Sequence, residues 1–446
     1  MSEGSLEAPT RHTIPWRDDA FYDEQALDAQ LRRVFDICHG CRRCFNLCDS
    51  FPKLFDLIDE SESGELDTVS SDGFKPVIDA CTLCDMCFMT KCPYVPPHEF
   101  DLDFPHLMLR ARAIEHKKGA TPFGVREMTK TDRNGRLAGA VAPIANWAAS
   151  CGNKLTRPAM ESVLGVHREA TLPEFHAISL MDQAAKPREI NTSAPAHGRK
   201  AVIYATCFAN YNNPAIGVSA LNVLAKNGVE TEVVYPRCCG MPQLEQGDLA
   251  SVAEAAAEVA ADMKPWIDKG YDIIALVPSC ALMMKFEWPL IVPENEDVTR
   301  LSAATRDITE YVVEIAKGDG MADGMKPLEG GVTIHIACHA RAQNMGQKGA
   351  EMLRLVPETD VQVIERCSGH GGSWGIMKEN FDVALKVGRP AARKVAENGS
   401  GHVVSECPLA RDHLLQGAER LAEKPLKISS AQHPIELMAR AYGFEN

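Results

Sequence analysis

Short runs of apolar residues recur through the second half of the chain, and each run ends at or near a cysteine. Three of them are AVIYATC, TEVVYPRCC and DIIALVPSC within residues 201–280, and three are VTIHIAC, VQVIERC and HVVSEC within residues 332–407. Helical patterns lie between them, notably at 248–270 and 380–399. Alternation of strands with helices predicts parallel sheets, which place ligands at the carboxyl ends of their strands.

The two sets of strands also predict an internal repeat. Cys207, Cys238 and Cys280 correspond to Cys338, Cys367 and Cys407, because YATCFAN matches HIACHAR, PRCCGMP matches ERCSGHG, and VPSCALMMK matches VSECPLARD. The Gly-rich stretch GDGMADGMKPLEGG separates the copies, which we place at 196–318 and 331–446. We therefore expect three cysteines that are distant along the chain to meet at one site in each copy.

Residues 1–100 carry eight cysteines in two groups, CHGCRRCFNLC and CTLCDMCFMTKCP. Three thiolates at i, i+3 and i+6 can bind three corners of an iron–sulfur cube, and in two-cluster ferredoxins the fourth ligand comes from the other motif. This rule predicts two [4Fe–4S] clusters. The ligands are Cys38, Cys41, Cys44 and Cys92 for one cluster, and Cys81, Cys84, Cys87 and Cys48 for the other.

Zinc is the alternative for these cysteines, but a zinc site favours paired C-x-x-C motifs with longer gaps over triplets. The motifs depart slightly from the usual ferredoxin run, because Asp49 replaces the proline that normally follows the first motif, whereas Pro93 follows the second. The segment FPKLFDLIDE has apolar residues at helical spacing, which favours a helical ferredoxin domain over a compact β-rich one.

Residues 101–195 are predicted to form a helical connector. The stretch LAGAVAPIANWAASCG, at 137–152, is the most apolar in the chain, and Pro143 and Asn146 interrupt it. We interpret it as a packed helix, with a helix that docks on a membrane surface or a partner as the alternative. Cys151 stands outside the patterned groups and is interpreted as a small buried apolar residue.

The net charge and the number of cysteines argue against some classes of protein. The 446 residues include 47 Lys and Arg against 61 Asp and Glu, a net charge of −14, which argues against a nucleic-acid partner. The N-terminus shows no signal-peptide pattern, and no apolar run approaches the roughly 18 residues of a membrane span. We therefore expect a cytoplasmic location, where sixteen cysteines indicate metal binding rather than disulfides.

Two ferredoxin motifs followed by two cysteine-rich α/β repeats resemble a known family. It includes the C subunit of anaerobic glycerol-3-phosphate dehydrogenase, the glycolate oxidase iron–sulfur subunit and heterodisulfide reductase-type proteins, and the resemblance covers about residues 30–440. It implies an α+α/β multidomain fold, with a helical two-cluster ferredoxin domain followed by a duplicated α/β cysteine-rich domain called CCG. The full CCG pattern is a lone Cys, then Cys-Cys-Gly, then C-x-x-C, and its five cysteines can hold a non-cubane cluster.

This chain departs from the full pattern in both repeats. The first repeat keeps Cys207, Cys238, Cys239 and Cys280, with Met283 in the fifth place, and the second keeps Cys338, Cys367 and Cys407, with Ser368 and Ala410 in the other two. The resemblance therefore implies one or two further clusters: an ordinary [4Fe–4S] cluster in the first repeat, and in the second a cluster with a non-thiolate ligand or an open iron. His339 and His370 are the candidates for that extra ligand, with polar loop residues as the alternative.

Charged and flexible residues recur beside the cysteines. Arg237 and Arg366 precede the middle cysteine of each repeat, while Lys285 and Arg411 follow the last one. Their repetition predicts a role in tuning a cluster or binding an anion, with solvated surface as the alternative. Gly240 and Gly369 are expected to allow close approach of the backbone to a cluster.

No phosphate-binding or dinucleotide-binding glycine motif is present, so we expect no flavin or nicotinamide on this chain. The predicted function is an electron-transfer subunit that relays single electrons between a flavoprotein dehydrogenase, or another redox protein, and a quinone, disulfide or protein acceptor. Contact with the inner face of the cell membrane is expected only through a partner or quinone. The alternatives are a stand-alone thiol, disulfide or peroxide reductase that uses an open iron in the second repeat, and an iron–sulfur sensor or scaffold. No catalytic residue is assigned.

Overall fold

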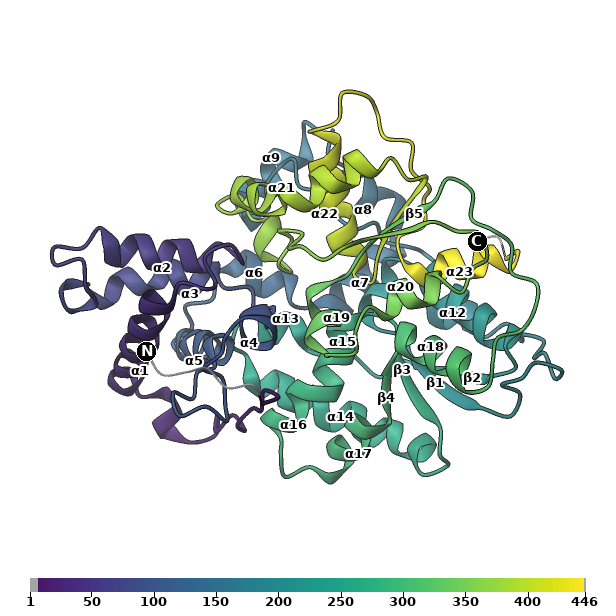
Figure 1. The fold of residues 1–446 in the computed structure, drawn as a ribbon, viewed down its shortest axis with the longest axis horizontal. Coiled ribbons are helices and arrows are strands. Elements are labelled where there is room, and N and C mark those ends of the chain that lie inside the picture. Colours follow the sequence, from purple (N-terminus) through teal and green to yellow (C-terminus); the bar gives the residue numbers. More distant parts are fainter. Residues whose placement is uncertain (1–6, 445–446) are drawn as a thin grey trace.

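The computed structural model describes residues 7–444, which form an N-terminal helical region, a connector and two α/β repeats (Figure 1). The N-terminal region is helical throughout its regular elements. These elements are η1 (Asp19–Tyr22), α1 (Glu24–Cys41), α2 (Ser50–Asp59), η2 (Leu66–Thr68), η3 (Ser71–Phe74), α3 (Lys75–Ala80), α4 (Met86–Thr90) and α5 (Phe104–Lys117).

The first repeat contains a parallel sheet with the strand order β2-β1-β3-β4. Strand β1 lies between β2 and β3, and its side chains from Ala201 to Tyr204 are buried because helices cover the sheet. The elements are β1 (Lys200–Tyr204), α11 (Cys207–Tyr211), α12 (Pro214–Lys226), β2 (Glu230–Val234), α13 (Met241–Leu244), α14 (Leu249–Ile267), β3 (Asp272–Ala275), α15 (Pro278–Leu282), the π-helical η4 (Met283–Glu287), α16 (Trp288–Ile291), α17 (Glu296–Ala304), β4 (Thr305–Asp307) and α18 (Ile308–Gly318).

The second repeat contains a smaller parallel sheet with the order β6-β5-β7, which matches β2-β1-β3 of the first. The predicted parallel sheets are therefore confirmed, and strand β4 is an addition that the sequence pattern did not indicate. The elements are β5 (Val332–His335), α19 (Cys338–Ala342), α20 (Lys348–Leu353), β6 (Val361–Ile364), η5 (Trp374–Ile376), α21 (Phe381–Asn398), β7 (His402–Ser405), α22 (Pro408–Glu419) and α23 (Pro434–Ala441).

The two repeats pack against each other. The C-terminal helix α23 lies on α12 of the first repeat, and α18 of the first repeat lies on α20 of the second (Figure 1). The short helices α15 and α19, which carry Cys280 and Cys338, also meet. Cysteine-bearing edges of the two sheets therefore face a common junction.

The connector contains α6 (Phe123–Met128), α7 (Thr131–Ala140), α8 (Ala142–Ala149), α9 (Thr156–Leu164) and α10 (Leu180–Ala184). It touches both repeats. Helix α7 lies against α11 of the first repeat, and Val166 forms an isolated antiparallel bridge with Met377 of the second. The connector thus fixes the two repeats relative to each other.

The prediction of a packed helix at 137–152 is wrong. Two short helices occupy this stretch, and their apolar side chains point outward: Leu137, Val141, Ile144 and Trp147 are 64, 48, 66 and 57% exposed. In residues 7–444, no helix is both long and apolar enough to cross a membrane. The interpretation of Cys151 as buried is also wrong, because this side chain is exposed and its thiol donates to the carbonyl oxygen of Ala170 at 3.3 Å.

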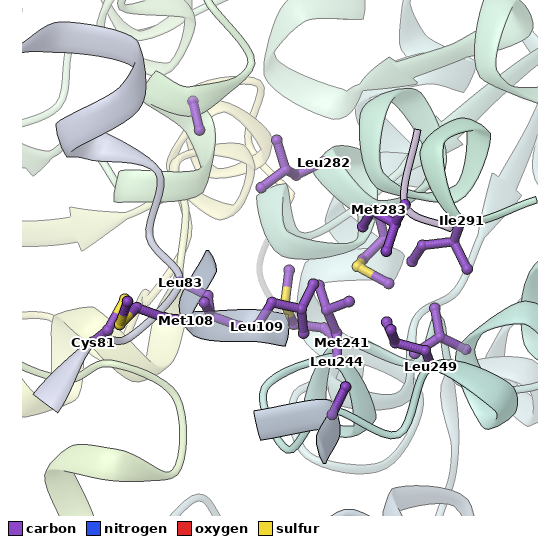
Figure 2. Close-up of a cluster of buried hydrophobic side chains, with 14 of the residues drawn as sticks. Cys81, Leu83, Met108, Leu109, Met241, Leu244, Leu249, Leu282, Met283 and Ile291 are labelled. Atoms are coloured by element: carbon purple, nitrogen blue, oxygen red, sulfur yellow. The ribbon is translucent and has the colours of Figure 1, made fainter. Parts of the chain in front are cut away.

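One apolar core joins the N-terminal region to the first repeat. In Figure 2, Leu83 and Leu109 of the N-terminal region lie in one row of apolar side chains with Met241 and Leu244 of the first repeat, and Cys81 lies at the far end of that row. Buried apolar area of this kind stabilises the contact in proportion to the surface removed from water. The cysteines of the N-terminal region are therefore held in a fixed position against the first repeat.

Candidate functional site

The first group of N-terminal thiols contains Cys38, Cys41, Cys44 and Cys92. Burial raises the pKa of Cys38 well above its usual value, and negative charge on the other three thiols raises it further. Burial also raises the pKa of Cys44 to about 12, again with contributions from Cys92 and Cys41. Mutual effects of this kind require proximity, so the structure brings together the four cysteines of the first predicted ligand set.

The second group contains Cys48, Cys81, Cys84 and Cys87. Burial, followed by the charges of Cys84 and Cys81, raises the pKa of both Cys48 and Cys87 well above the usual value. Cys87 also interacts with Cys44 of the first group. The two groups therefore adjoin, as two clusters would need to do if electrons passed between them.

A backbone N–H donates to the sulfur of the cysteine two residues earlier at several of these sites. Such bonds stabilise a thiolate, and in iron–sulfur proteins they help to set the reduction potential. Three of the donor residues, Leu83, Gly240 and Gly369, have positive φ angles of 47°, 84° and 79°. The donor–acceptor pairs are Ser50–Cys48, Leu83–Cys81, Met86–Cys84, Tyr94–Cys92, Gly240–Cys238 and Gly369–Cys367.

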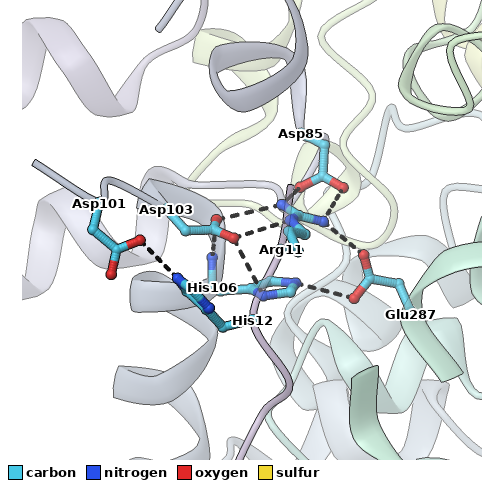
Figure 3. A network of polar contacts seen from close by, with 7 residues as sticks. All are labelled: Arg11, His12, Asp85, Asp101, Asp103, His106 and Glu287. Atoms are coloured by element: carbon cyan, nitrogen blue, oxygen red, sulfur yellow. Dashed lines mark hydrogen bonds and ion pairs between the residues drawn. The ribbon is translucent and has the colours of Figure 1, made fainter. Parts of the chain in front are cut away.

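A buried polar network fixes the loop between Cys84 and Cys87 (Figure 3). The guanidinium group of Arg11 contacts Asp85 at 2.7 Å, Asp103 at 2.9 Å and Glu287 at 2.8 Å. His106 adds a contact of 3.1 Å to Glu287. Burial alone would raise the pKa of Glu287, but the positive charges of His106 and Arg11 lower it to about 2. The network ties the second cysteine group to the N-terminal segment and to η4 of the first repeat.

The first repeat gathers all four of its predicted cysteines. The Sγ atoms of Cys207 and Cys238 are 3.6 Å apart, and those of Cys239 and Cys280 are 3.3 Å apart. Cys238 and Cys239 also interact with each other. Three of these cysteines are buried. Four thiols from three strand ends therefore meet at the carboxyl edge of the first sheet, because parallel strands place their ends on the same side.

Asp132 belongs to the same site, although it lies in the connector. Its Oδ2 accepts a hydrogen bond of 2.9 Å from the N–H of Cys238, and its Oδ1 accepts one from the Tyr235 hydroxyl. The neighbouring Thr131 has a buried hydroxyl that has no hydrogen-bond partner among the described residues. Sequence reasoning missed both residues, because no pattern in the chain links 131–132 to the strand ends.

The fifth place of the CCG pattern cannot bind metal in either repeat. Met283 is fully buried among apolar side chains that include Leu249 and Ile291 (Figure 2). Ala410, its counterpart, has no donor atom. The first repeat therefore offers four thiols, the number that a [4Fe–4S] cluster uses.

The second repeat brings together two of its three cysteines and adds one from outside. A hydrogen bond from Cys338 lowers the pKa of Cys367 to about 7, and Cys338 also lowers the pKa of Cys84. Cys407 immediately precedes helix α22, and burial, with contributions from Asp412 and Glu406, raises its pKa to about 11. Ser368 is buried, and its Oγ accepts a hydrogen bond of 3.3 Å from the N–H of His370. This repeat does not present four thiols.

The two candidate histidines differ. His339 is engaged on both nitrogens: Nδ1 is 2.8 Å from the Ser279 hydroxyl, and Nε2 is 3.4 Å from the carbonyl oxygen of Leu83. It therefore joins the first repeat to the N-terminal region. His370 is buried with no hydrogen-bond partner on either ring nitrogen in the described part of the chain, and burial, aided by His413, lowers its pKa to about 3. Only His370 has nitrogens free for a ligand.

The repeated cations are mostly engaged in structural contacts. Arg237 pairs with Glu258 at 2.7 Å, and Lys285 pairs with Glu310 at 2.8 Å. Arg411 is buried and donates to backbone carbonyl oxygens. Arg366 is exposed and has no ion pair within residues 7–444. Gly369 is required by its surroundings, because a Cβ there would lie 2.0 Å from the carbonyl oxygen of Ala384.

Within the described residues, no three His, Cys, Asp or Glu side chains are arranged as ligands of a single metal ion. A four-iron cluster makes a different demand, because it takes four thiolates rather than ligands around one ion. Three groups of four cysteines fit that demand in donor type, and each group includes an N–H contact to sulfur. The second repeat does not fit it.

The chain matches the family described as CCG, a cysteine-rich domain, at residues 201–285 and again at 332–410. It is 25% identical over 348 residues to the C subunit of anaerobic glycerol-3-phosphate dehydrogenase from Escherichia coli, covering 76% of this chain and 82% of that protein. It is 27% identical to an uncharacterized iron–sulfur protein of Methanocaldococcus jannaschii, covering 52% and 44%.

A further relative is the D subunit of dihydromethanophenazine:CoB–CoM heterodisulfide reductase from Methanosarcina mazei. The identity is 23% over 384 residues, which cover 83% of this chain and 80% of that protein. These relatives and the two domain matches agree with the duplication in the sequence and with the paired sheets. The chain therefore carries two CCG cysteine-rich domains and is similar to an iron–sulfur protein and to subunits of two oxidoreductases.

Proposed function

We propose that this chain is an electron-transfer component of an oxidoreductase complex and holds three [4Fe–4S] clusters. Two are bound by the N-terminal groups, Cys38, Cys41, Cys44 and Cys92, and Cys48, Cys81, Cys84 and Cys87. The third is bound by Cys207, Cys238, Cys239 and Cys280 in the first repeat. Such clusters accept and donate single electrons. The residues of this chain supply the thiolates, the N–H groups that stabilise them and the burial that keeps water away.

The proposal is supported by a series of neighbouring cysteine thiols that crosses the molecule. The first N-terminal group meets the second through Cys44 and Cys87, and the second meets the second repeat through Cys84 and Cys338. His339, next to Cys338, is in turn bonded to Ser279, next to Cys280. Each candidate cluster site therefore has a neighbour, which is what a relay requires.

The domain boundaries proposed for this chain lie between its helices and strands. We propose a ferredoxin-type domain up to about residue 100, a connector to about 195, and CCG domains at 196–318 and 331–446. The exposed apolar side chains of the connector, among them Ile144 and Trp147, are proposed as the surface that docks a redox partner such as a flavoprotein dehydrogenase. Any peripheral contact with a membrane would use the same partner or surface.

The test is electron uptake and turnover by the anaerobically purified chain. A reduced dye should reduce the clusters stoichiometrically, and a redox titration followed by EPR should resolve one-electron signals. The isolated chain should not sustain turnover with a disulfide or a peroxide. Sustained turnover would favour the stand-alone reductase instead, and absence of any iron–sulfur EPR signal would overturn the proposal.

A further inference from the structure

A pocket of about 400 Å³ lies between the N-terminal region and the second repeat. The segment 43–48 and residues 90–91 form one wall, and the other is formed by residues of α19, the Cys367 turn and α21. The side chains of Cys48 and Cys367 both contribute to its lining. Its volume falls in the range of small-molecule sites, roughly 300–1,000 Å³.

Positive charge dominates this pocket. Its lining includes Arg43, Lys91, Arg341 and Arg366 against a single carboxylate, Glu365, which is 4.0 Å from Arg341. The other three cations are exposed and have no ion-pair partner in the part of the chain that the structure describes. Four cations in one pocket of a chain with a net charge of −14 create a local field that attracts anions.

The remaining surface of the pocket is largely apolar. Phe45, Leu47, Val387 and Pro390 line it, and Phe45 is 50% exposed although it stacks on Phe55. An exposed aromatic ring beside free guanidinium groups suits a ligand that has both an apolar body and a negative charge. A fully hydrated inorganic anion would leave this apolar surface unused.

We propose that this pocket binds a small organic anion with an apolar or aromatic part, such as an aromatic carboxylate or sulfonate. A bound anion would lie next to the second N-terminal cysteine group, because Cys48 lines the pocket. An effect of the bound anion on electron transfer rests on the proposed function, whereas the binding of the anion does not.

Binding is tested by calorimetric titration of the full-length protein with 2-naphthalenesulfonate at low ionic strength. The Arg43→Gln/Lys91→Gln variant should bind about tenfold more weakly, a change of about 1.4 kcal/mol that the loss of two charge contacts can supply. Asn46→Trp, which fills the pocket from an exposed position without changing charge, should abolish binding. Added salt should weaken binding in the unsubstituted protein.

Arg136→Gln is the matched control. Arg136 is an exposed arginine without an ion pair among the described residues, and it lines a different basic pocket of about 260 Å³ beside Cys238. Its replacement should leave the affinity within about twofold. An equal loss in this variant, unchanged binding in Asn46→Trp, or binding only of an acidic peptide and not of the sulfonate would overturn the proposal.

A second readout separates the pocket from the proposed function. A bound anion should lower the midpoint potential of the nearest cluster, because negative charge disfavours the added electron. If the sulfonate binds as expected but the protein shows no iron–sulfur signal, the function proposal fails and the pocket stands. If the clusters are present and the sulfonate does not bind, the pocket proposal fails alone.

Discussion

The thiols of Cys338 and Cys84 interact, and this interaction joins the second CCG domain to the second N-terminal cysteine group. The interaction lowers the pKa of Cys84, while the interactions with Cys367 and Cys84 raise the pKa of Cys338 well above its usual value. The CCG pattern would make Cys338 a metal ligand within its own domain. In this structure it instead lies near Cys84 of the second N-terminal group.

Replacement of Cys338 should change the midpoint potential of the cluster proposed on Cys84 without removing that cluster. Cys338→Ala should lower the midpoint potential of the cluster proposed on Cys84 by about 20–60 mV, since a hydrogen bond contributes about 0.5–1.5 kcal/mol and about 59 mV corresponds to 1.4 kcal/mol for one electron. Cys338→Ser, which keeps a donor, should restore most of the shift. EPR redox titration measures both, and loss of iron from Cys338→Ala would show that Cys338 is itself a ligand.

Asp132 should be needed for the cluster proposed in the first repeat. Asp132→Ala leaves the N–H of Cys238 and the hydroxyl of Tyr235 without their acceptor, and each unsatisfied buried donor costs about 1–3 kcal/mol. We expect faster loss of iron from this variant on exposure to a chelator, with Asp132→Asn retaining more because its oxygen still accepts. Equal iron retention in all three proteins would contradict this role.

Arg11 should be essential for stability although it lies near the N-terminus. Arg11→Met leaves Asp85, Asp103 and Glu287 buried without their cation and should cost about 3–5 kcal/mol, measured by thermal or denaturant unfolding. Arg17→Met is the control, because Arg17 and its partner Glu294 are 55 and 56% exposed and such pairs contribute about 0–1 kcal/mol. Similar losses in both variants would contradict the assignment.

The same network should make the free energy of unfolding depend on pH at acid pH. The pKa of Glu287 is lowered to about 2 in the folded protein, against 4.5 as its ordinary value. Because the unfolded state then binds more protons between these values, the contribution is complete above about pH 4.5 and is lost as pH falls toward 2. Glu287→Gln should flatten this part of the curve, and an unchanged slope would contradict it.

The raised pKa of Glu245 should have the opposite effect and make stability fall as pH rises toward 7. Its side chain lies half-buried against Gly372 at the junction of the two repeats, and partial removal of the carboxylate from water, partly offset by Arg112, raises its pKa to about 7. The folded state therefore binds more protons than the unfolded state between pH 4.5 and 7, so stability falls as pH rises through this window. Glu245→Gln should remove that fall in melting temperature, and a fall of the same size in the variant would contradict it.

Much of this architecture could be predicted because its signals are local. The strand runs, the matching flanks of Cys207 and Cys338, and the cysteine triplets all stand in short segments of sequence. The parallel sheets follow from alternation, and the meeting of the first repeat's cysteines follows from parallel strand ends. The addition of β4 escaped prediction because three residues, Thr305–Asp307, carry too little pattern.

The features that escaped prediction depend on tertiary contacts. Nothing near Asp132 or Arg11 in the sequence indicates that they reach Cys238 or Asp85, because those contacts form only when separate regions pack. The outward face of residues 137–149 has the composition of a buried helix, and only the fold shows that Ile144 and Trp147 face solvent. The contact between Cys84 and Cys338 likewise depends on how the N-terminal region docks on the second repeat.

The central claim is that the first CCG domain holds a cluster and the second does not. Iron and sulfide counting with EPR on anaerobically purified protein tests it directly, using the unsubstituted chain, Cys239→Ala and Cys407→Ala. With four irons per cubane, we expect about 12 irons in the unsubstituted chain and in Cys407→Ala, and about 8 in Cys239→Ala. About 8 irons in the unsubstituted chain, or a loss of iron from Cys407→Ala, would contradict the account.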